Sequence, residues 1–278
     1  MSTRLPTAQL RSHLGRAAEF GQTLLTHRGP PPGGLILAYH DVVADEAGHN
    51  KWVVGVDRLR GHVETLRRLG YRIVHLTEIV DAVIAGRSPD RMAALTFDDA
   101  LEGVYRFGAP TLAELGAPAT VFVVSNAWSS APAWWPGSAP VMTLEELQEM
   151  TALGWSVGAH SRTHPSLPSL AGPILAGEVA GAVEELQRLG FAPVDTFAYP
   201  FGHYNAAVIE AVSASSCRAA CSFLNGRVSA ADDRFQLPRL TMGVHVSNQR
   251  LAYHALRSSA SWPAHQVGES LGGGDEPG

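Results

Sequence analysis

Short apolar runs and amphipathic stretches alternate along the chain. The apolar runs are rich in β-branched, aromatic and small side chains, which predicts buried strands. They are residues 35–39 (LILAY), 71–74 (YRIV), 93–97 (AALTF), 119–124 (ATVFVV), 155–159 (WSVGA), 194–199 (VDTFAY) and 218–223 (RAACSF). Apolar positions three and four apart predict helices over residues 57–69, 77–86, 105–115, 143–153, 175–189 and 205–212. About seven strand–helix units in series favour a mostly parallel α/β sheet closed into a barrel.

The two ends of the chain differ from this alternating region. Residues 1–33 are a weakly amphipathic extension, predicted to be partly helical, that ends in RGPPPGG. Residues 258–278 include LGGGDEPG, whose composition cannot build a core, so we expect disorder there. The predicted folded domain therefore spans residues 34–257.

Composition narrows the function classes. With 45% hydrophobic and 17% charged residues the chain is an ordinary globular protein, and a net charge of −5 without a dense Lys/Arg run argues against a nucleic-acid partner. No window approaches the roughly 20 apolar residues of a membrane span, and Arg4, Arg11 and Arg16 interrupt the apolar core that a signal peptide needs. We therefore expect a cytoplasmic protein with no membrane partner. Cys217 and Cys221 are the only cysteines, and two buried thiols are expected.

Polar residues follow three of the predicted strands at the point where each strand ends. They are His40 and Asp41, Asp98 and Asp99, and His160. In a parallel barrel the carboxyl ends of the strands meet at one mouth, so we expect these side chains to converge.

Asp98 and Asp99 are adjacent acids behind an apolar run. Burying one ion is costly without compensation, and like charges repel. Asp99 alone could cap a helix that begins near Leu101, which leaves Asp98 unexplained. A nearby cation would explain both acids.

The segment AHSRTHP contains two histidines four residues apart. That spacing puts His160 and His164 on one side of a helical turn and favours a metal pair, although a lone histidine is usually a hydrogen-bonded structural residue. Ser161 stands where the motif H-E-x-x-H has its glutamate, so the third ligand and the base must come from elsewhere. One aspartate completes a His₂Asp site with a position open for water, and the other can accept the proton of that water.

Two further segments carry competing interpretations. GWSVG matches the nucleophile elbow G-x-S-x-G, but Ser156 lies inside an apolar run rather than on a sharp turn, so we interpret it as a strand residue. In FAYPFGHYN, Pro200 and Gly202 mark a turn, and the backbone N–H of Phe201 is a candidate oxyanion donor. A plain turn between strand and helix is the alternative.

TFDD, HSRTH and a YPFG segment, in this order and spacing, resemble the motifs of the polysaccharide deacetylases (carbohydrate esterase family 4, the chitooligosaccharide deacetylase homology domain). LILAYHDVV, GAPTLAELGAPATVFVV and FQLPRLTMGV resemble further segments of the family, so the resemblance covers roughly residues 35–256. It implies a distorted (β/α)₇ barrel as a single catalytic domain over residues 34–257. It also implies removal of acetyl groups from an N-acetylated carbohydrate with a divalent metal, commonly zinc.

The resemblance assigns roles to individual residues. Asp98 matches the catalytic base, Asp99, His160 and His164 match the metal ligands, and Pro200 and Phe201 match the turn whose backbone amide binds the oxyanion. Candidate substrate-binding residues are His40, Tyr199 and three tryptophans of the 126–140 loop, Trp128, Trp134 and Trp135. These rings can stack on sugars or pack under the loop.

The chain departs from the family pattern at several positions. Ala100 replaces the usual glycine, and Ala198 stands where an arginine often orients the base, so Arg239 is a hypothetical substitute. The late Leu-x-His that supplies a general acid has no clean match. His245 is the nearest candidate, with a solvated or structural histidine as the alternative.

Three functional hypotheses follow. The first is a metal-dependent glycan deacetylase. The second keeps the metal site but acts on a small N-acyl or amide substrate, and the third is a carbohydrate-binding relative with impaired turnover. The sequence leaves the sugar and the oligomeric state open.

Overall fold

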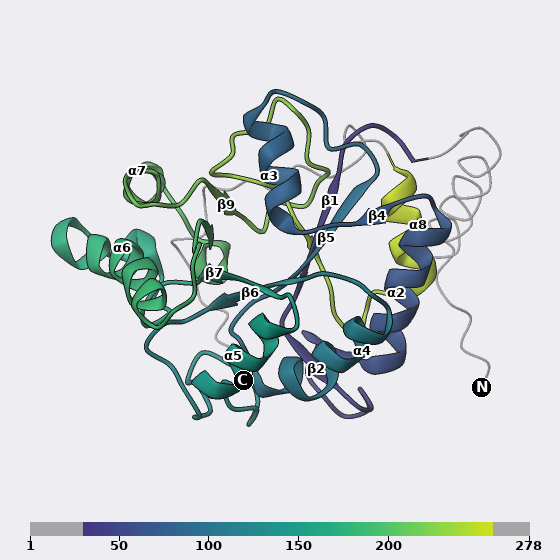
Figure 1. Ribbon diagram of the computed structural model, residues 1–278, viewed down its shortest axis with the longest axis horizontal. Helices are drawn as coiled ribbons and strands as arrows, with labels where there is room; N and C mark the ends of the chain where they lie inside the picture. Colours follow the sequence, from purple (N-terminus) through teal and green to yellow (C-terminus); the bar gives the residue numbers. More distant parts are fainter. Residues whose placement is uncertain (1–29, 258–278) are drawn as a thin grey trace, which may run out of the picture.

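One parallel sheet runs through the middle of the molecule, with helices packed around it (Figure 1). The computed structural model describes residues 30–257, so residues 1–29 of the predicted extension and all of the predicted tail lie outside the described residues. The strands are β1 (Leu35–Tyr39), β2 (Asp41–Val43), β3 (Val53–Gly55), β4 (Arg72–Ile73), β5 (Met92–Phe97), β6 (Thr120–Val123), β7 (Ser156–Ala159), β8 (Thr196–Ala198), β9 (Ala219–Cys221) and β10 (Leu240–Thr241). The main sheet has the order β10-β1-β5-β6-β7-β8-β9, with β4 paired to β5, while β2 and β3 pair separately.

The segment that leads into β10 joins the two edges of this sheet. On one side, the Leu237 N–H donates to Ala220 O at 2.9 Å and the Ser222 N–H donates to Leu237 O at 2.9 Å. On the other side, Leu240 is paired in parallel with Leu37 of β1. The predicted α/β fold of the (β/α)₇ type is therefore confirmed, as one domain.

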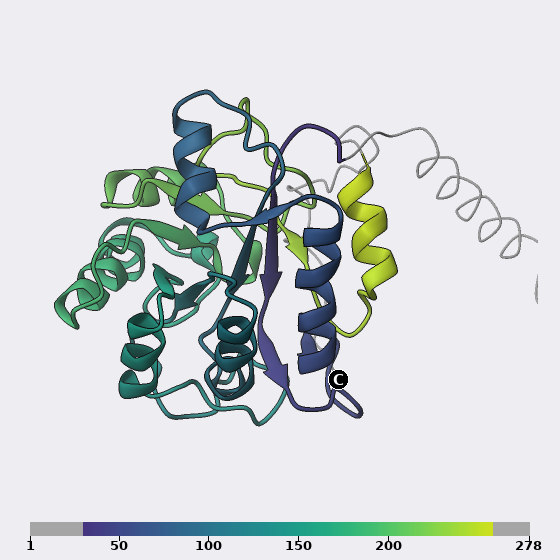
Figure 2. The same ribbon diagram turned by 45° about the vertical axis from the view of Figure 1, so that its right-hand side comes forward.

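The helices surround the sheet, and α2 and α8 lie side by side along one flank (Figures 1 and 2). They are α2 (Val56–Arg68), α3 (Leu76–Ile84), α4 (Ala109–Glu114), α5 (Leu144–Ala152), α6 (Gly172–Arg188), α7 (Ala206–Ala214) and α8 (Asn248–Leu256), with a π-helical turn η1 (Val104–Gly108) and 3-10 turns η2 (Leu167–Ser169) and η3 (Pro200–Gly202). The stripe Leu59, Val63 and Leu66 of α2 is fully buried against the sheet, as its spacing predicts. Between residues 30 and 257, no helix combines the length and the apolar character that crossing a membrane requires.

Helix α3 closes the end of the barrel where the strands begin. Its apolar side packs against alternate strand residues that point inward, including Ile36, Ala94, Phe122 and Ala198. The His75 ring before α3 contacts the hydroxyl of Ser156 at the start of β7, with Nδ1 and Oγ 3.1 Å apart. The opposite end, where the strands finish, stays open for polar side chains.

Most predicted elements are present, and the exceptions have local causes. Helix α3 begins at Leu76 with His75 as its N-cap, one residue before the predicted start of that helix at residue 77. At the start of α5, the Thr143 hydroxyl accepts from the Glu146 N–H at 3.1 Å and the Glu146 carboxylate accepts from the Thr143 N–H at 2.7 Å, which forms a capping box. The strands β2, β3 and β10 were not predicted, because they are too short to show a clear apolar period. The helix α8 was not predicted either.

Candidate active site

The parallel register brings the ends of several strands to one mouth of the barrel. Tyr39 of β1 is paired with Phe97 of β5, and the Asp98 N–H extends that ladder to Tyr39 O at 2.9 Å. The His160 N–H likewise donates to Val123 O at the end of β6, at 2.8 Å. The side chains of His40, Asp98, Asp99 and His160 therefore converge there, as predicted. Asp41 does not join them, because its carboxylate accepts from the Val42 N–H at 2.8 Å and faces Gly103.

Asp99, His160 and His164 form a buried cluster of possible metal ligands. One ligand atom from each lies within 4.8 Å of the others. The Oδ1 atom of Asp99 is 3.7 Å from Nε2 of His160 and 3.3 Å from Nε2 of His164. The candidate ligands thus face a common point.

The HSRTH segment reaches this geometry through a turn and not through a helix. Ser161 and His164 both have left-handed backbones, with φ of 63° and 61°. The Ser161 hydroxyl accepts from the His164 N–H at 2.9 Å, which closes the turn. The prediction of two imidazoles on a helical turn is therefore wrong in conformation, although the two rings do converge.

The two adjacent acids have different surroundings. Asp98 is fully buried, and its carboxylate accepts two bonds from Arg239, at 2.7 and 2.8 Å. Burial alone would raise the pKa of Asp98, but the Arg239 guanidinium and His160 outweigh it and lower that pKa to about 2. For Asp99, burial and then the neighbouring Asp98 raise the pKa to about 7. Asp99 is therefore a buried acid without a compensating cation, which a bound metal ion would provide.

Arg239 belongs to the segment that closes the sheet, and it is fully buried. Its Nε donates to Ser222 O at 3.0 Å, and Nη1 also reaches the Thr96 hydroxyl at 3.2 Å. The guanidinium carbon lies 4.6 Å from the centre of the Phe223 ring. The Arg239 side chain thus lies where it can orient the Asp98 carboxylate. It can therefore substitute for the arginine that the family often has at the position of Ala198.

The two imidazoles are in the form that binds metals. His160 Nδ1 is 2.7 Å from Ala198 O, and a carbonyl only accepts, so Nδ1 carries the proton and Nε2 keeps its lone pair. Burial lowers the pKa of His160, and it lowers the pKa of His164 to about 2. Two neutral imidazoles and one carboxylate are a donor set suited to Zn²⁺ and related divalent ions. The residues present therefore fit the predicted metal.

A cavity of about 340 Å³ lies over the cluster. It is lined by His40, Trp52, Asp99, Trp134, Trp135, Pro136, His160, His164, Phe201, Phe223, Asn225 and Thr241. The cavity therefore combines aromatic walls with the candidate metal ligands.

His40 is one wall of this cavity and is almost fully buried. Its ring stacks on Phe223, with the ring centres 5.9 Å apart, and on Trp135 at 5.8 Å. Among the described residues its Nδ1 has no hydrogen-bond partner. Burial lowers the pKa of His40 to about 4, and the carboxylate of Asp98 opposes that effect.

Several predicted site residues do not line the cavity. The Trp128 indole donates to Ser125 O at 3.0 Å, the fully buried Tyr199 donates its hydroxyl to Phe235 O at 2.8 Å, and Pro200 is buried in the turn. His245 is exposed beside Lys51. The expected roles of Trp128 and Tyr199 in substrate binding, and of His245 as the acid, are therefore not supported by geometry.

The YPFG turn brings Phe201 to the cavity. Phe201 is left-handed at φ 57°, and its ring meets His164 edge-on with the ring centres 4.5 Å apart. Gly202 follows at φ 70°, and a Cβ there would lie 2.6 Å from the Phe223 ring, so only glycine fits. The turn's own bonds run from the Gly202 N–H to Tyr199 O and from the His203 N–H to Pro200 O, and they do not use the Phe201 N–H.

Five cavity residues were missed from the sequence: Trp52, Pro136, Phe223, Asn225 and Thr241. Phe223 is the last residue of the predicted strand 218–223, so its position could have been found, whereas Thr241 ends β10, which was not predicted. Trp52 lies between β2 and β3, which carried no strand signal.

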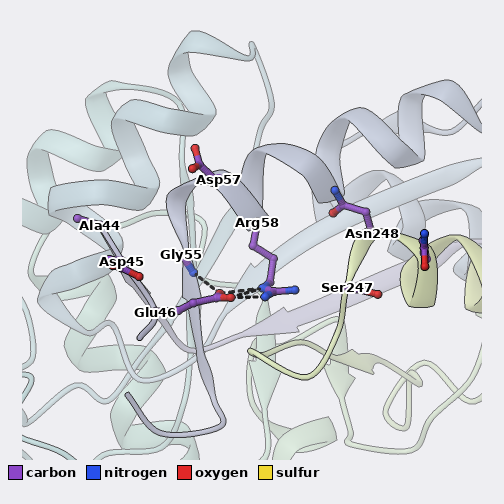
Figure 3. Close-up of a pocket in the computed structure, with 9 residues that line it drawn as sticks. Ala44, Asp45, Glu46, Gly55, Asp57, Arg58, Ser247 and Asn248 are labelled. Carbon is purple, nitrogen blue, oxygen red and sulfur yellow. Dashed lines mark hydrogen bonds and ion pairs between the residues drawn. The ribbon is translucent and has the colours of Figure 1, made fainter. Parts of the chain in front are cut away.

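A more open cavity of about 460 Å³ lies where α2 and α8 begin (Figure 3). The carboxylate of Glu46 crosses it to a double hydrogen bond with Arg58, and the Gly55 N–H donates to Glu46 Oε2 at 3.1 Å. These bonds tie the β2–β3 connection to α2. They pair the charge of Glu46 with that of Arg58.

Comparison with known protein families identifies the central part of the chain. Residues 85–220 match the family model for polysaccharide deacetylase, a span that includes both acids, both histidines and Phe201. The resemblance to the polysaccharide deacetylases that the sequence motifs indicate is therefore confirmed. No curated protein matches the chain in sequence.

Solved structures share the fold over most of the chain. The Streptococcus pyogenes deacetylase PplD, solved in complex with acetate, is 22% identical with a TM-score of 0.70, over 81% of this chain and 99% of that one. IcaB from Ammonifex degensii is 21% identical with a TM-score of 0.69, over 83% and 100%. A de-N-acetylase from Aggregatibacter actinomycetemcomitans is 19% identical with a TM-score of 0.67, over 80% and 99%. At these identities the likeness establishes the fold.

Proposed function

Residues 85–220 belong to the polysaccharide deacetylase family, and from that premise we propose that the protein is a metal-dependent hydrolase. Its reaction is removal of N-acetyl groups from an N-acetylated sugar or glycan, and its metal is Zn²⁺ or a similar divalent ion. The observation that carries the proposal is the division of the two acids. Asp99 faces two imidazoles, whereas Asp98 faces a guanidinium.

Asp99, His160 and His164 would hold the ion. The chemistry that a bound divalent ion supplies is a more acidic water and a polarised acetyl carbonyl.

Asp98 is the proton acceptor. The low pKa of Asp98 keeps it ionised at neutral pH, and each of its oxygens retains a second lone pair beside the bond to Arg239. Asp98 therefore takes the proton of the attacking water, while the bidentate guanidinium fixes the plane of the carboxylate.

The remaining steps stabilise the oxyanion and release the amine. The Phe201 N–H donates to the oxygen that becomes negative when water adds to the acetyl carbon. The carbon–nitrogen bond then breaks, acetate leaves with the new oxygen, and the amine needs a proton. We assign delivery of that proton to His40, which lines the cavity with an Nδ1 that has no partner among the described residues, in place of the exposed His245. Burial keeps the free His40 ring neutral, so the ring first takes up the proton that Asp98 accepted from water and then passes it to the amine.

The cavity walls support a carbohydrate substrate. Trp52, Trp134, Trp135, Phe201 and Phe223 surround the cluster with aromatic faces and edges. Such rings pack on the C–H faces of sugars.

Acetate release from chitooligosaccharides tests the proposal. The protein is assayed as purified, after chelation, and after addition of Zn²⁺. We expect turnover to be lost on chelation and restored by the ion. Turnover that is insensitive to chelation would exclude the proposed mechanism.

Two variants test the division of roles between the adjacent acids. Asp98→Asn should keep Zn²⁺ and lose roughly 100-fold or more of kcat, because the proton acceptor is removed while the three candidate metal ligands remain. Asp99→Ala should lose Zn²⁺ and activity together. Equal metal content in both variants would contradict the assignment.

The same assay distinguishes the two alternatives. Acetate from small N-acyl compounds, with none from sugars, would indicate the metabolite hydrolase. Sugar binding without acetate release would indicate the impaired carbohydrate-binding relative.

A further inference from the structure

Trp134 contacts two of the three candidate metal ligands. Its indole N–H donates to Asp99 Oδ1 at 3.0 Å, the oxygen that also faces both imidazoles. Its ring lies flat on the His164 ring, with centres 4.5 Å apart and an angle of 14° between the planes. One side chain of the 126–140 loop thus touches both the acid and a histidine.

The two histidines are oriented by different means. His160 is fixed by its hydrogen bond from Nδ1 to Ala198 O, the type of outer contact that metal-binding histidines normally make. The Nδ1 atom of His164 is buried and, among the described residues, has no hydrogen-bond partner. Packing must therefore hold the His164 ring, and the rings that do so are Trp134 on its face and Phe201 on its edge.

The loop backbone holds Trp134 in place. The Trp135 N–H donates to Pro132 O at 3.1 Å, and Pro132 is buried. The Asn50 side chain donates to Pro136 O at 3.0 Å, which ties the loop to the β2–β3 connection. These two hydrogen bonds fix the backbone next to Trp134, and they thereby hold its indole in position.

We infer that Trp134 is a positioning residue of the metal site, an inference that rests on the proposed function. Its N–H orients the Asp99 carboxylate, and its ring face keeps His164 Nε2 directed at Asp99. A carboxylate oxygen has two lone pairs, so Oδ1 can accept from the indole and still bind an ion. The aromatic face replaces the outer hydrogen bond that His164 lacks.

Zn²⁺ affinity, measured by competition with a chromophoric chelator, tests this role without an activity assay. Trp134→Phe keeps a ring on His164 and loses the N–H, so its Kd for Zn²⁺ should rise about 10-fold. Trp134→Ala loses both contacts, and its Kd should rise about 100-fold, within the range for outer-shell partners of a metal site.

Trp128→Phe is the matched control. Trp128 lies in the same loop and also donates its indole N–H to an oxygen, Ser125 O, but it does not line the cavity. Its Zn²⁺ affinity should stay within about twofold of wild type, because outer-shell effects need contact with a ligand. Thermal melting in chelator shows whether each variant folds.

The possible outcomes separate this inference from the proposed function. If wild type binds Zn²⁺ and Trp134→Phe binds it equally well while folded, the inference is overturned and the proposed function stands. If Trp128→Phe weakens binding as much as Trp134→Phe, the loop acts as a whole and the inference is overturned as well. If wild type binds neither Zn²⁺ nor another divalent ion such as Co²⁺ or Mn²⁺, both are overturned.

Discussion

Replacing Arg239 with methionine should destabilise the fold and disable Asp98 together. Arg239 and Asp98 are both fully buried, and two hydrogen bonds of 2.7 and 2.8 Å join them. Methionine fills much of the same space but cannot donate a hydrogen bond or carry charge. The variant therefore leaves Asp98 buried without its cation.

The expected cost is about 3–5 kcal/mol, the range for removing one partner of a buried ion pair. Loss of the bond from Arg239 Nε to Ser222 O leaves a buried carbonyl unsatisfied and favours the upper end of that range. The double variant Asp98→Asn with Arg239→Met carries neither charge. Its stability should return toward that of wild type, because apolar or neutral replacements of a whole buried pair are often tolerated.

The four proteins of this comparison are wild type, Asp98→Asn, Arg239→Met and the double variant. Their urea unfolding, measured with chelator at neutral pH, gives the coupling energy between positions 98 and 239. We expect each single variant to be less stable than the double variant, so the coupling energy should exceed the cost of either single variant and be at least about 3–5 kcal/mol. Additive effects, with a coupling below about 1 kcal/mol, would refute the buried pair and with it the positioning of the base.

Three further predictions concern other residues. His40→Gln should lower kcat for acetate release roughly 100-fold, as loss of a general acid does, whereas His245→Gln should stay near wild type; similar losses would refute the assignment of the proton donor. His62 is buried, and burial lowers its pKa from 6.5 to about 4, so the folded state favours the neutral ring and stability falls as pH drops from 6.5 through about 4. The difference corresponds to about 3 kcal/mol, and urea unfolding at high and low pH should show a smaller loss for His62→Gln than for wild type; equal losses would count against a neutral buried ring. Gly202→Ala should cost about 1–2 kcal/mol in thermal unfolding and lower activity, because the left-handed backbone and the Phe223 ring exclude a Cβ; an unchanged melting temperature would contradict this turn.

The sequence predicts the strands and the candidate metal ligands well, because both depend on local patterns. Apolar runs such as AALTF identify buried strands, and polar residues directly after them must lie at the barrel mouth once the sheet is parallel. Asp98, Asp99 and His160 follow this rule. Short strands without an apolar period, β2 and β10 among them, are found only when tertiary contacts are known.

Side-chain direction is the part that the sequence does not determine. Trp128 and Trp134 lie six positions apart in one loop, yet one donates to Ser125 O and the other to Asp99. Tyr199 ends a strand at the correct mouth, but its hydroxyl is buried against Phe235 O. Loop residues have no fixed periodicity, so tertiary packing decides which of them face the cavity.

The cation that compensates Asp98 could not have been established from the pattern around TFDD, because charge compensation here is not local. Arg239 is 141 positions away from Asp98, in the segment that joins the edges of the sheet. The same segment bonds to β9 through Leu237 and to β1 through Leu240. Closing the barrel and compensating the charge of Asp98 are therefore one structural event, because an open sheet would leave Asp98 buried beside Asp99 without a positive charge. It follows that Asp98, the proposed base, can be held ionised in this position only in the closed barrel.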